Sequence, residues 1–398
     1  MTTLSREEIF EKAGQLREFG VYNEPLTQRW QRVEDERWLQ DTPICAVAGL
    51  NNMDTDGALL ELLRQNPQDV LAGLELAAIA VNAQAKVLVL PEGENQLGES
   101  LAELAAQYGV ELEYGMVNAR QYRGSAVHHI ETMIALAQTV DGRYEPGTWV
   151  AVRKDGRTGP LRRVEYGTTV AEVLGGDAQG LRAFALGRAL YTADSLGMAI
   201  APDTNLGNGV ITLYPDSCCI IHEAEQVLLD ERKRSCGKCT FCREGLIQLH
   251  THTREITQGK GKKESLDMMS EIGQAMVFST PCSVGKTGSR FTLDSMALFA
   301  EEYEDHIKRH KCKNNVCSAF TSIYIDPSLC QGCEECADVC PEECIEGKAG
   351  YIHMIDEFDC TKCGKCIEAC DYDAIVLTAG RVPKLPTRLI KCGKFNKR

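Results

Sequence analysis

The sequence lacks the features that would direct a protein into or across a membrane. Residues 1–14 mix charged and apolar side chains and contain neither an apolar core nor a cleavage site, so we expect no secretory signal and a cytoplasmic location. The longest apolar stretch, residues 70–90, is interrupted by four polar or charged residues and is too polar to cross a bilayer. We therefore expect no membrane span.

Nucleotide-binding motifs are also missing. Glycine-rich loops hold phosphates because bare backbone N–H groups can approach the anion. Residues 1–45 contain only Gly14 and Gly20, and no G-x-G-x-x-G follows a predicted strand. Gly285-Lys286-Thr287 resembles the end of a P-loop, but Thr280 stands where that motif requires glycine. We interpret this segment as a loop beside Cys282.

Basic residues are too few for a nucleic-acid-binding protein. Lys and Arg number 43 against 57 Asp and Glu, which gives a net charge of −14. Residues 321–380 hold thirteen acids and three bases, a balance of −10, whereas residues 381–398 hold seven bases and no acid. Charge of either sign suits docking to a surface of the opposite sign. We predict that the acidic block and the basic tail contact protein partners.

Cysteine, in contrast, is abundant, with nineteen residues. In a cytosolic chain so many cysteines indicate metal binding or redox chemistry rather than disulfides. Two runs near the C-terminus read C-x2-C-x2-C-x3-C and are offset by thirty residues throughout, which indicates an internal duplication. They are Cys330, Cys333, Cys336 and Cys340, followed by Cys360, Cys363, Cys366 and Cys370.

This spacing is typical of ferredoxins with two [4Fe-4S] clusters, in which the fourth cysteine of each run ligates the other cluster. One predicted ligand set is therefore Cys330, Cys333, Cys336 and Cys370. The other is Cys360, Cys363, Cys366 and Cys340. The alternative is zinc, but zinc sites usually pair two C-x2-C knuckles rather than repeat four cysteines twice.

A third group supplies three cysteines at C-x2-C-x2-C spacing and needs one further thiolate. The three are Cys236, Cys239 and Cys242, and Cys282 is the best candidate for the fourth ligand. Residues 222–234, 265–278 and 293–307 have helical patterns. We predict a small helical bundle with one [4Fe-4S] cluster at its end.

The remaining cysteines have no predicted ligand role. Cys344 occupies the position of Ala374 in the second repeat, and buried cysteine packs as a small hydrophobic residue. Packing is also the default for the Cys218-Cys219 pair, and Cys45 is given no role. We assign no role to Cys312 and Cys317, expect no fourth cluster, and interpret Cys392 as a free thiol. Adjacent residues point apart, so His128-His129 is interpreted as structural.

The segment SCGKCTFCREG, residues 235–245, followed by one later cysteine, resembles the FMN-containing subunit of respiratory complex I. It is equally similar to the diaphorase subunit of NAD-linked hydrogenases. The resemblance extends to residues 68–91, 126–136 and 147–174 and covers roughly residues 45–312. It implies a Rossmann-like domain, a β-grasp domain and the helical bundle.

The family's flavin-binding elements are missing or altered in this chain. In that family FMN lies on a glycine-rich loop near the N-terminus, and no such loop is present here. An Asn-x-Asp-Glu turn is matched at best by Asn51-Asn52-Met53-Asp54, and a Gly-Glu-Glu-Thr stretch is missing. His128-His129 replaces an Asn-Asn pair. We expect no FMN and assign no catalytic residue.

The predicted fold is a multidomain α/β protein. We predict a polar helical docking segment at 1–44, a Rossmann-like remnant at 45–145 and a β-grasp domain at 146–190. A linker at 191–221 leads to the cluster-binding helical bundle at 222–311. The ferredoxin domain at 312–378 and the basic tail at 379–398 complete the chain.

These features predict an electron-transfer subunit that relays single electrons through three [4Fe-4S] clusters. With no flavin or substrate motif in the chain, its partners would include a flavin- or NAD(P)-binding subunit and a terminal oxidoreductase. One alternative is a catalytic NAD(P)H dehydrogenase subunit with an altered FMN site. Another is a zinc-bound scaffold, which the cubane spacing of twelve cysteines disfavours.

Overall fold

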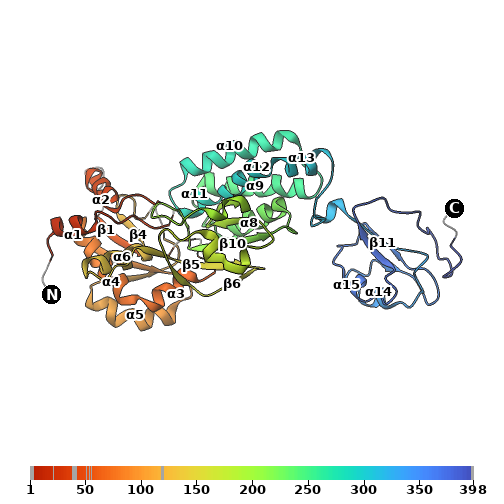
Figure 1. The fold of residues 1–398 in the computed structure, drawn as a ribbon, viewed down its shortest axis with the longest axis horizontal. Coiled ribbons are helices and arrows are strands. Elements are labelled where there is room, and N and C mark those ends of the chain that lie inside the picture. The colour runs from red at the N-terminus through yellow and green to blue at the C-terminus, as the bar shows by residue number, and fades with distance from the viewer. Residues whose placement is uncertain are drawn as a thin grey trace. The chain divides into compact units, whose positions relative to one another are not determined.

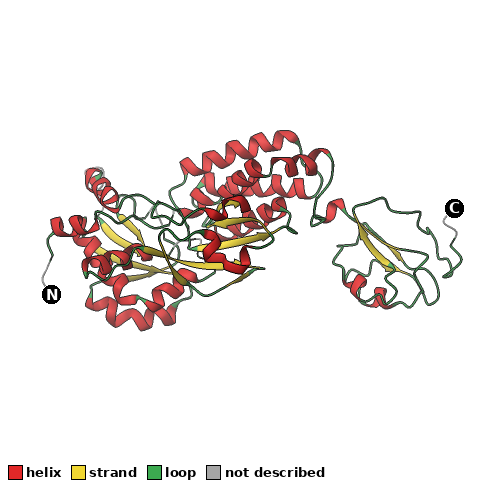
Figure 2. Cartoon of the chain, viewed as in Figure 1, coloured by secondary structure: helices red, strands yellow, loops and turns green. Residues whose placement is uncertain are grey.

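The computed structural model describes residues 4–20, 22–37, 43–50, 52, 54, 56–117 and 121–395. It divides into two compact units. The first comprises residues 1–216, 226–250 and 266–298, and the second comprises residues 217–225, 251–265 and 299–398. Helices and strands alternate in the first unit, whereas loops dominate the C-terminal part of the second (Figure 2). No helix in the described part of the chain is long and apolar enough to cross a membrane.

The N-terminal part of the first unit is a parallel sheet with helices packed against it (Figure 1). Its order is β3-β2-β1-β4, and every pairing is parallel. The strands are β1 (Cys45–Gly49), β2 (Ala85–Leu90), β3 (Glu111–Tyr114) and β4 (Ala126–His129). The helices are α3 (Ala58–Gln65), α4 (Pro67–Ala80), α5 (Asn95–Gln107) and α6 (Ile130–Val140).

Local sequence accounts for these elements. Pro67 begins α4, where its fixed φ and missing N–H have no cost, and Val70, Leu74 and Ala77 are fully buried on one face. Gly109 ends the turn after α5 at a φ of +59°, a conformation that favours glycine. Sequence patterns predict helices at 67–81 and 97–108 and strands at 86–90 and 110–114, within a few residues of the observed α4, α5, β2 and β3.

The N-terminal segment differs from the polar docking segment predicted at 1–44. It contains α1 (Arg6–Ala13) and α2 (Leu26–Asp35), whose apolar faces belong to the core of the parallel sheet. Ile9 and Trp30 are fully buried. The spacing of Leu26, Trp30 and Val33 is the i, i+4, i+7 pattern of an amphipathic helix, which the many neighbouring charges obscure.

A second sheet follows in the same unit, with the order β6-β5-β10-β8-β9 and β7 paired to β5. Its strands are β5 (Gly147–Lys154), β6 (Arg157–Thr158), β7 (Arg162–Glu165), β8 (Leu181–Leu186), β9 (Ala189–Thr192) and β10 (Val210–Pro215). Helix α7 (Val170–Leu174) carries a capping box between Thr169 and Glu172. Strand β10 lies in the centre of the sheet, although the sequence predicts a linker at 191–221.

A group of helices carries the first cysteine cluster. The helices are α8 (Ile220–Arg234), α9 (Thr240–Thr257), α10 (Lys263–Ser279), α11 (Ser283–Thr287), α12 (Arg290–Leu298) and α13 (Ala300–Lys308). The pattern at 293–307, expected to be one helix, is two helices that meet at Phe299.

The C-terminal module has little regular structure. Strand β11 (Ser322–Ile325) pairs with β14 (Ile375–Thr378), and β12 (Ile345–Glu346) pairs with β13 (Met354–Ile355). The short helices α14 (Glu335–Asp338) and α15 (Lys365–Glu368) follow the cysteine loops of the two repeats. Part of the predicted basic tail packs on this module, where Ile352 N–H donates to Ile390 O and Cys392 N–H donates to Gly350 O.

Gly73 allows α4 and α6 to approach closely, because a Cβ there would lie 2.0 Å from Met133 O. Replacing glycine by alanine inside a helix usually stabilises by about 1 kcal/mol. Here the clash outweighs that gain, and we expect Gly73→Ala to destabilise the unit by about 1–3 kcal/mol in urea unfolding followed by circular dichroism. Gly176→Ala, where a Cβ meets nothing within 4 Å, is the control and should change little.

Candidate functional site: a closed nucleotide crevice and three cysteine clusters

The parallel sheet has one place where a ligand would ordinarily bind. From β1 the chain continues to β2 and β3 on one side of β1, and β4 then pairs with β1 on its other side. The switch point, where the strand order reverses, therefore lies between β1 and β4. Ligands of such sheets bind outside the carboxyl ends of the strands at this point. These ends are Gly49 and His129, and His129 is also the N-cap of α6.

In this chain a carboxylate of the protein itself occupies the start of α6. The side chain of Glu18 is 1% exposed and accepts three hydrogen bonds. The donors are His128 Nδ1 at 2.6 Å, His129 N at 2.7 Å and Thr132 Oγ1 at 2.9 Å. A helix N-terminus is where a phosphate would bind, because its N–H groups and dipole favour an anion. Glu18 supplies that anion.

Residues of α2 surround the Glu18 carboxylate. Arg29 Nε lies 3.8 Å from Glu18 Oε2 and donates to Val127 O at 3.0 Å. Trp30 Nε1 donates to His128 Nε2 at 3.2 Å. An indole N–H can only donate, so His128 Nδ1 carries the proton that is donated to Glu18. Burial alone would raise the pKa of Glu18, but His128 and Arg29 outweigh it and hold this pKa below its ordinary value of 4.5.

Little space remains in the crevice. The cavity lined by Glu18, Tyr22, Gly49 and His129 has a volume of about 70 Å³. Sites for cofactors and drug-sized ligands usually measure about 300–1,000 Å³. Cys282 lines the same cavity, and Tyr22 Oη donates to Pro281 O at 2.9 Å. The N-terminal segment therefore fills the space between the sheet and the loop that carries Cys282.

The segment compared with the family's flavin-holding turn has internal partners here. Asn52 exchanges two hydrogen bonds with Val117, at 3.0 and 2.9 Å, and Asp54 Oδ2 accepts from Leu60 N at 3.1 Å. Asn51 and Met53 of that segment lie outside the described residues. His128 and His129 are both buried and take structural positions, as the sequence predicts.

The first cysteine group lies at the start of α9 and the start of α11. Cys242 is buried, and Ser235 Oγ lies 3.6 Å from its sulfur. Burial, together with the charges of neighbouring thiols, raises the pKa of the Cys242 thiol to about 11. These neighbours are Cys282, Cys239 and Cys236. Cys282 is the N-cap residue of α11. The structure thus brings the four predicted ligands near one another.

The second and third groups combine cysteines from both repeats. Burial, together with the charges of neighbouring thiols, raises the pKa of Cys336 to about 12. These neighbours are Cys330, Cys333, Cys370 and Cys366. One cavity is lined by all four predicted ligands of the other set, which are Cys340, Cys360, Cys363 and Cys366. The fourth cysteine of each repeat therefore lies beside the other repeat's first three.

Two further thiols lie beside these groups. Cys344 is buried, and its sulfur is 3.5 Å from Cys340 Sγ. Cys392 packs in the same apolar cluster, and Cys330 is among the groups that raise its pKa after burial. The packing interpretation of Cys344 is compatible with this position. Cys392 is half-buried rather than exposed on a free tail.

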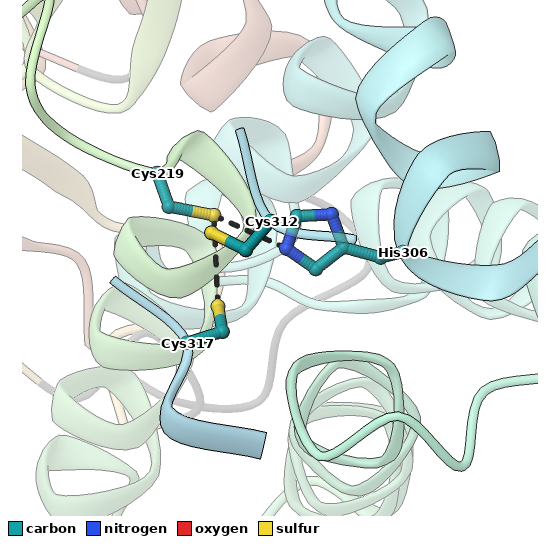
Figure 3. A group of neighbouring side chains, drawn as sticks. All are labelled: Cys219, His306, Cys312 and Cys317. Atoms are coloured by element: carbon teal, nitrogen blue, oxygen red, sulfur yellow. Dashed lines mark hydrogen bonds between the residues drawn. The ribbon is translucent and has the colours of Figure 1, made fainter. Parts of the chain in front are cut away.

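Sequence reasoning missed one group of side chains. Cys219, His306, Cys312 and Cys317 are all buried, and their candidate ligand atoms lie within 4.8 Å of one another (Figure 3). We call these residues the Cys3His group. A signal was present in the paired cysteines of KCKNNVC, residues 311–317, but Cys219 and His306 are distant in sequence.

Comparison with known proteins identifies two iron–sulfur modules. Residues 224–306 match the NADH-ubiquinone oxidoreductase-F iron–sulfur binding region, and residues 322–372 match a 4Fe-4S dicluster domain. These modules contain the helices of the first cysteine group and the duplicated cysteine runs. The chain thus contains one region similar to the iron–sulfur binding region of the NADH-ubiquinone oxidoreductase F subunit and one region similar to a 4Fe-4S dicluster domain.

Individual relatives are subunits of redox complexes. The chain is 36% identical over 171 residues to the NADP-reducing hydrogenase subunit HndC of Solidesulfovibrio fructosivorans, covering 43% of this chain and 35% of the relative. It is 30% identical over 112 residues to the F subunit of NADH-quinone oxidoreductase from Streptomyces coelicolor, covering 28% and 25%. The matches thus span about a third or less of these relatives.

The fold is also similar to that of a solved hydrogenase. The crystal structure of an NAD⁺-reducing [NiFe]-hydrogenase in the H2-reduced state matches with a TM-score of 0.62 and 18% identity. The match covers 77% of this chain and 63% of that one. The resemblance found in the sequence, to complex I and NAD-linked hydrogenase subunits, is confirmed.

Removing the charge of Glu18 should destabilise the first unit. We expect Glu18→Gln to lower the free energy of unfolding by about 3 kcal/mol at pH 7. The buried Arg29 would then lose the charge of Glu18, the fully buried one of its two carboxylate partners. Glu24→Gln, which alters a half-buried carboxylate bound to the same Arg29, is the matched control and should cost about 1 kcal/mol or less.

The pH dependence provides an independent test of the same variant. Because the folded-state pKa of Glu18 is lowered, its stabilisation is present above pH 4.5 and is lost as the pH falls through the folded-state pKa. Unfolding curves of wild type and Glu18→Gln should therefore converge below pH 4.5. A difference that stays constant with pH would contradict the assignment.

Proposed function

We propose that this chain is a flavin-free electron-transfer subunit that binds three [4Fe-4S] clusters. The observation that carries the proposal is the gathering of twelve cysteines into three groups of four, two of which draw ligands from both repeats. When bound, a [4Fe-4S] cluster takes up and releases one electron at a time. The partners would be a flavin- or NAD(P)-linked subunit and a terminal oxidoreductase subunit.

The donor set fits cubane clusters better than single ions. Among the described residues, the Cys3His group is the only one whose candidate ligand atoms all lie within 4.8 Å of one another. The twelve cysteines predicted to bind the three clusters form no group as tight as this. A cubane stands between its thiolates and therefore needs them further apart than a single ion does. In this proposal Cys336 and Cys366 anchor the clusters from buried positions, whereas Cys333 and Cys363 lie exposed towards solvent.

The crevice at the switch point does not fit FMN. The glycine-rich loop that holds FMN in the family is missing, and a phosphate at the start of α6 would have to displace Glu18, which accepts hydrogen bonds from His129 N and Thr132 Oγ1. The remaining cavity of about 70 Å³ is several times smaller than an ordinary cofactor site. These two observations support an assignment without FMN, and they leave the source of electrons on another chain.

One observation favours the alternative, an NAD(P)H dehydrogenase subunit with an altered flavin site. His129 Nε2 is buried without a hydrogen-bond partner among the described residues, and this residue lines the crevice. A ligand could accept a hydrogen bond from that atom if the N-terminal segment moved aside. Cofactor analysis distinguishes the two functions.

Exposed apolar side chains beside the cluster cysteines support docking to another protein. Phe358, two residues before Cys360, is 96% exposed. Three more exposed apolar residues lie within two residues of a ferredoxin cysteine in sequence, and these are Leu329, Val339 and Tyr372. Exposed apolar groups ringed by charge mark interaction sites, and the surrounding block has a balance of −10. We propose that this surface receives a partner with a basic face.

The cofactor content tests the function directly. Chain purified anaerobically should contain about twelve iron and twelve sulfide per chain and no FMN. Cys282→Ser should lower iron by about four, whereas Cys45→Ser, in β1 and outside the three groups, should leave it unchanged. One FMN per chain would contradict the flavin-free assignment and would favour the dehydrogenase.

Phe358 tests the docking surface. Phe358→Ala should weaken binding of the natural partner about tenfold or more, as for an aromatic anchor residue, with iron content unchanged. Phe358→Tyr keeps the aromatic area and is the control. Binding is measured by titrating the purified partner protein, and equal affinities of the two variants would exclude this surface.

A further inference from the structure

The Cys3His group converges from three separate segments of the second unit. Cys219 precedes α8, His306 lies in α13, and Cys312 and Cys317 lie in the link between α13 and β11 (Figure 3). All four side chains are buried. Three of the four lie outside the two regions that match iron–sulfur modules, and His306 is the last residue of the first region. The known modules therefore give the group no role.

The distances within the group are those of ligands around a single ion. Cys219 Sγ lies 3.5 Å from His306 Nε2 and 3.7 Å from Cys317 Sγ. In a tetrahedral zinc site with Zn–S of about 2.3 Å and Zn–N of about 2.0–2.1 Å, neighbouring sulfurs are about 3.8 Å apart. A sulfur and a nitrogen are then about 3.6 Å apart. The observed spacing matches both values.

The imidazole of His306 is held in the form that binds metals. Its Nδ1 lies 2.8 Å from Glu302 O, and a carbonyl oxygen can only accept, so Nδ1 carries the proton. Nε2 therefore directs its lone pair towards the sulfur of Cys219. Donation of the second ring N–H to a backbone carbonyl is the usual arrangement behind a metal-bound histidine.

The protein backbone also favours thiolates at this place. Cys219 lies at the N-terminus of α8, a helix of fifteen residues, and its carbonyl accepts from Glu223 N at 3.0 Å. The positive end of the helix dipole stabilises a thiolate there. Between Cys312 and Cys317 the chain turns through Asn315 at a φ of +55°, which returns the second sulfur to the first.

A group of neutral thiols does not account for this arrangement. Thiols are weak donors and weak acceptors. Hydrogen bonds between sulfurs would therefore contribute little stability to a group of three thiols buried beside an imidazole. Three thiolates without a cation would repel one another. A divalent cation removes both difficulties, and a closed set of three sulfurs and one nitrogen is a structural zinc set.

We propose that the Cys3His group binds one structural Zn²⁺, with Sγ of the three cysteines and Nε2 of the histidine as ligands. Zinc has no accessible second oxidation state, so the site transfers no electrons. It would fasten the link after α13 to the start of α8. That link also contacts a cluster loop, because Lys362 Nζ donates to Ser318 O at 2.8 Å. The proposal does not depend on the electron-transfer function.

Metal analysis of the full chain, purified anaerobically, tests the site. We expect about one zinc per chain in the wild type and less than about 0.2 in Cys219→Ser. Cys218→Ser, the adjacent residue outside the group, is the matched control and should retain one zinc. Iron content should be equal in all three proteins. A wild type without zinc, or equal zinc loss in both variants, would overturn the proposal.

X-ray absorption at the zinc edge measures the ligands of zinc alone, without a signal from iron, and it can be recorded on the wild-type protein. It should show about three sulfurs at about 2.3 Å and one nitrogen at about 2.0–2.1 Å. A shell of four sulfurs, with zinc lost in Cys363→Ser but not in Cys219→Ser, would mean that zinc had replaced iron in a cluster site. A thirteenth iron in place of zinc would likewise refute the assignment.

Discussion

The second unit is organised around cysteines that the fold brings together from distant points of the sequence. Its C-terminal module has two two-stranded ribbons and two helices of four residues, so hydrogen-bonded structure alone provides little stability. Its buried cluster consists of five isoleucines, four cysteines and one alanine, so cysteine makes up a large part of it. In small modules of this kind, the free energy of metal binding is also the free energy of folding. The exchange of Cys340 and Cys370 between repeats would join the two halves, because each cluster would need ligands from both.

The first unit is stabilised in the ordinary way, by apolar packing. Its main core joins α1 and α2 to the parallel sheet and buries Trp30 completely. Such a core does not require a ligand at the switch point. The charged residues placed there, above all Glu18 and Arg29, are instead satisfied by His128, Thr132 and backbone groups. The charged groups at the switch point thus have partners within the chain itself.

Local patterns in the sequence predict much of this structure. The cysteine spacing indicates both modules, and periodicity predicts α4, β2, α5 and β3. The prediction of a linker at 191–221 misses β10, because a single short strand gains its stability from pairing with β5 and β8, which are distant in sequence. The prediction of a polar segment at 1–44 misses the buried faces of α1 and α2 for a related reason, since burial is decided by tertiary contacts.

The candidate site likewise has parts that local sequence predicts and parts that it does not. Ligands in repeated C-x2-C runs can be recognised locally, but the Cys3His group combines residues 98 apart, Cys219 and Cys317, and includes a histidine with no neighbouring motif. The Glu18 network joins residues 110 apart, so the missing glycine loop could be seen in the sequence but its replacement could not. Only the folded chain reveals which side chain fills the crevice.

The position of Glu18 has a consequence for competition at the crevice. Its carboxylate is attached to the chain, so it meets the start of α6 at the high effective concentration of an intramolecular partner and loses little translational freedom on binding. A free nucleotide would have to displace this tethered anion and also open the packing around Trp30. The tethered carboxylate would therefore raise the concentration that a free nucleotide needs to occupy the crevice.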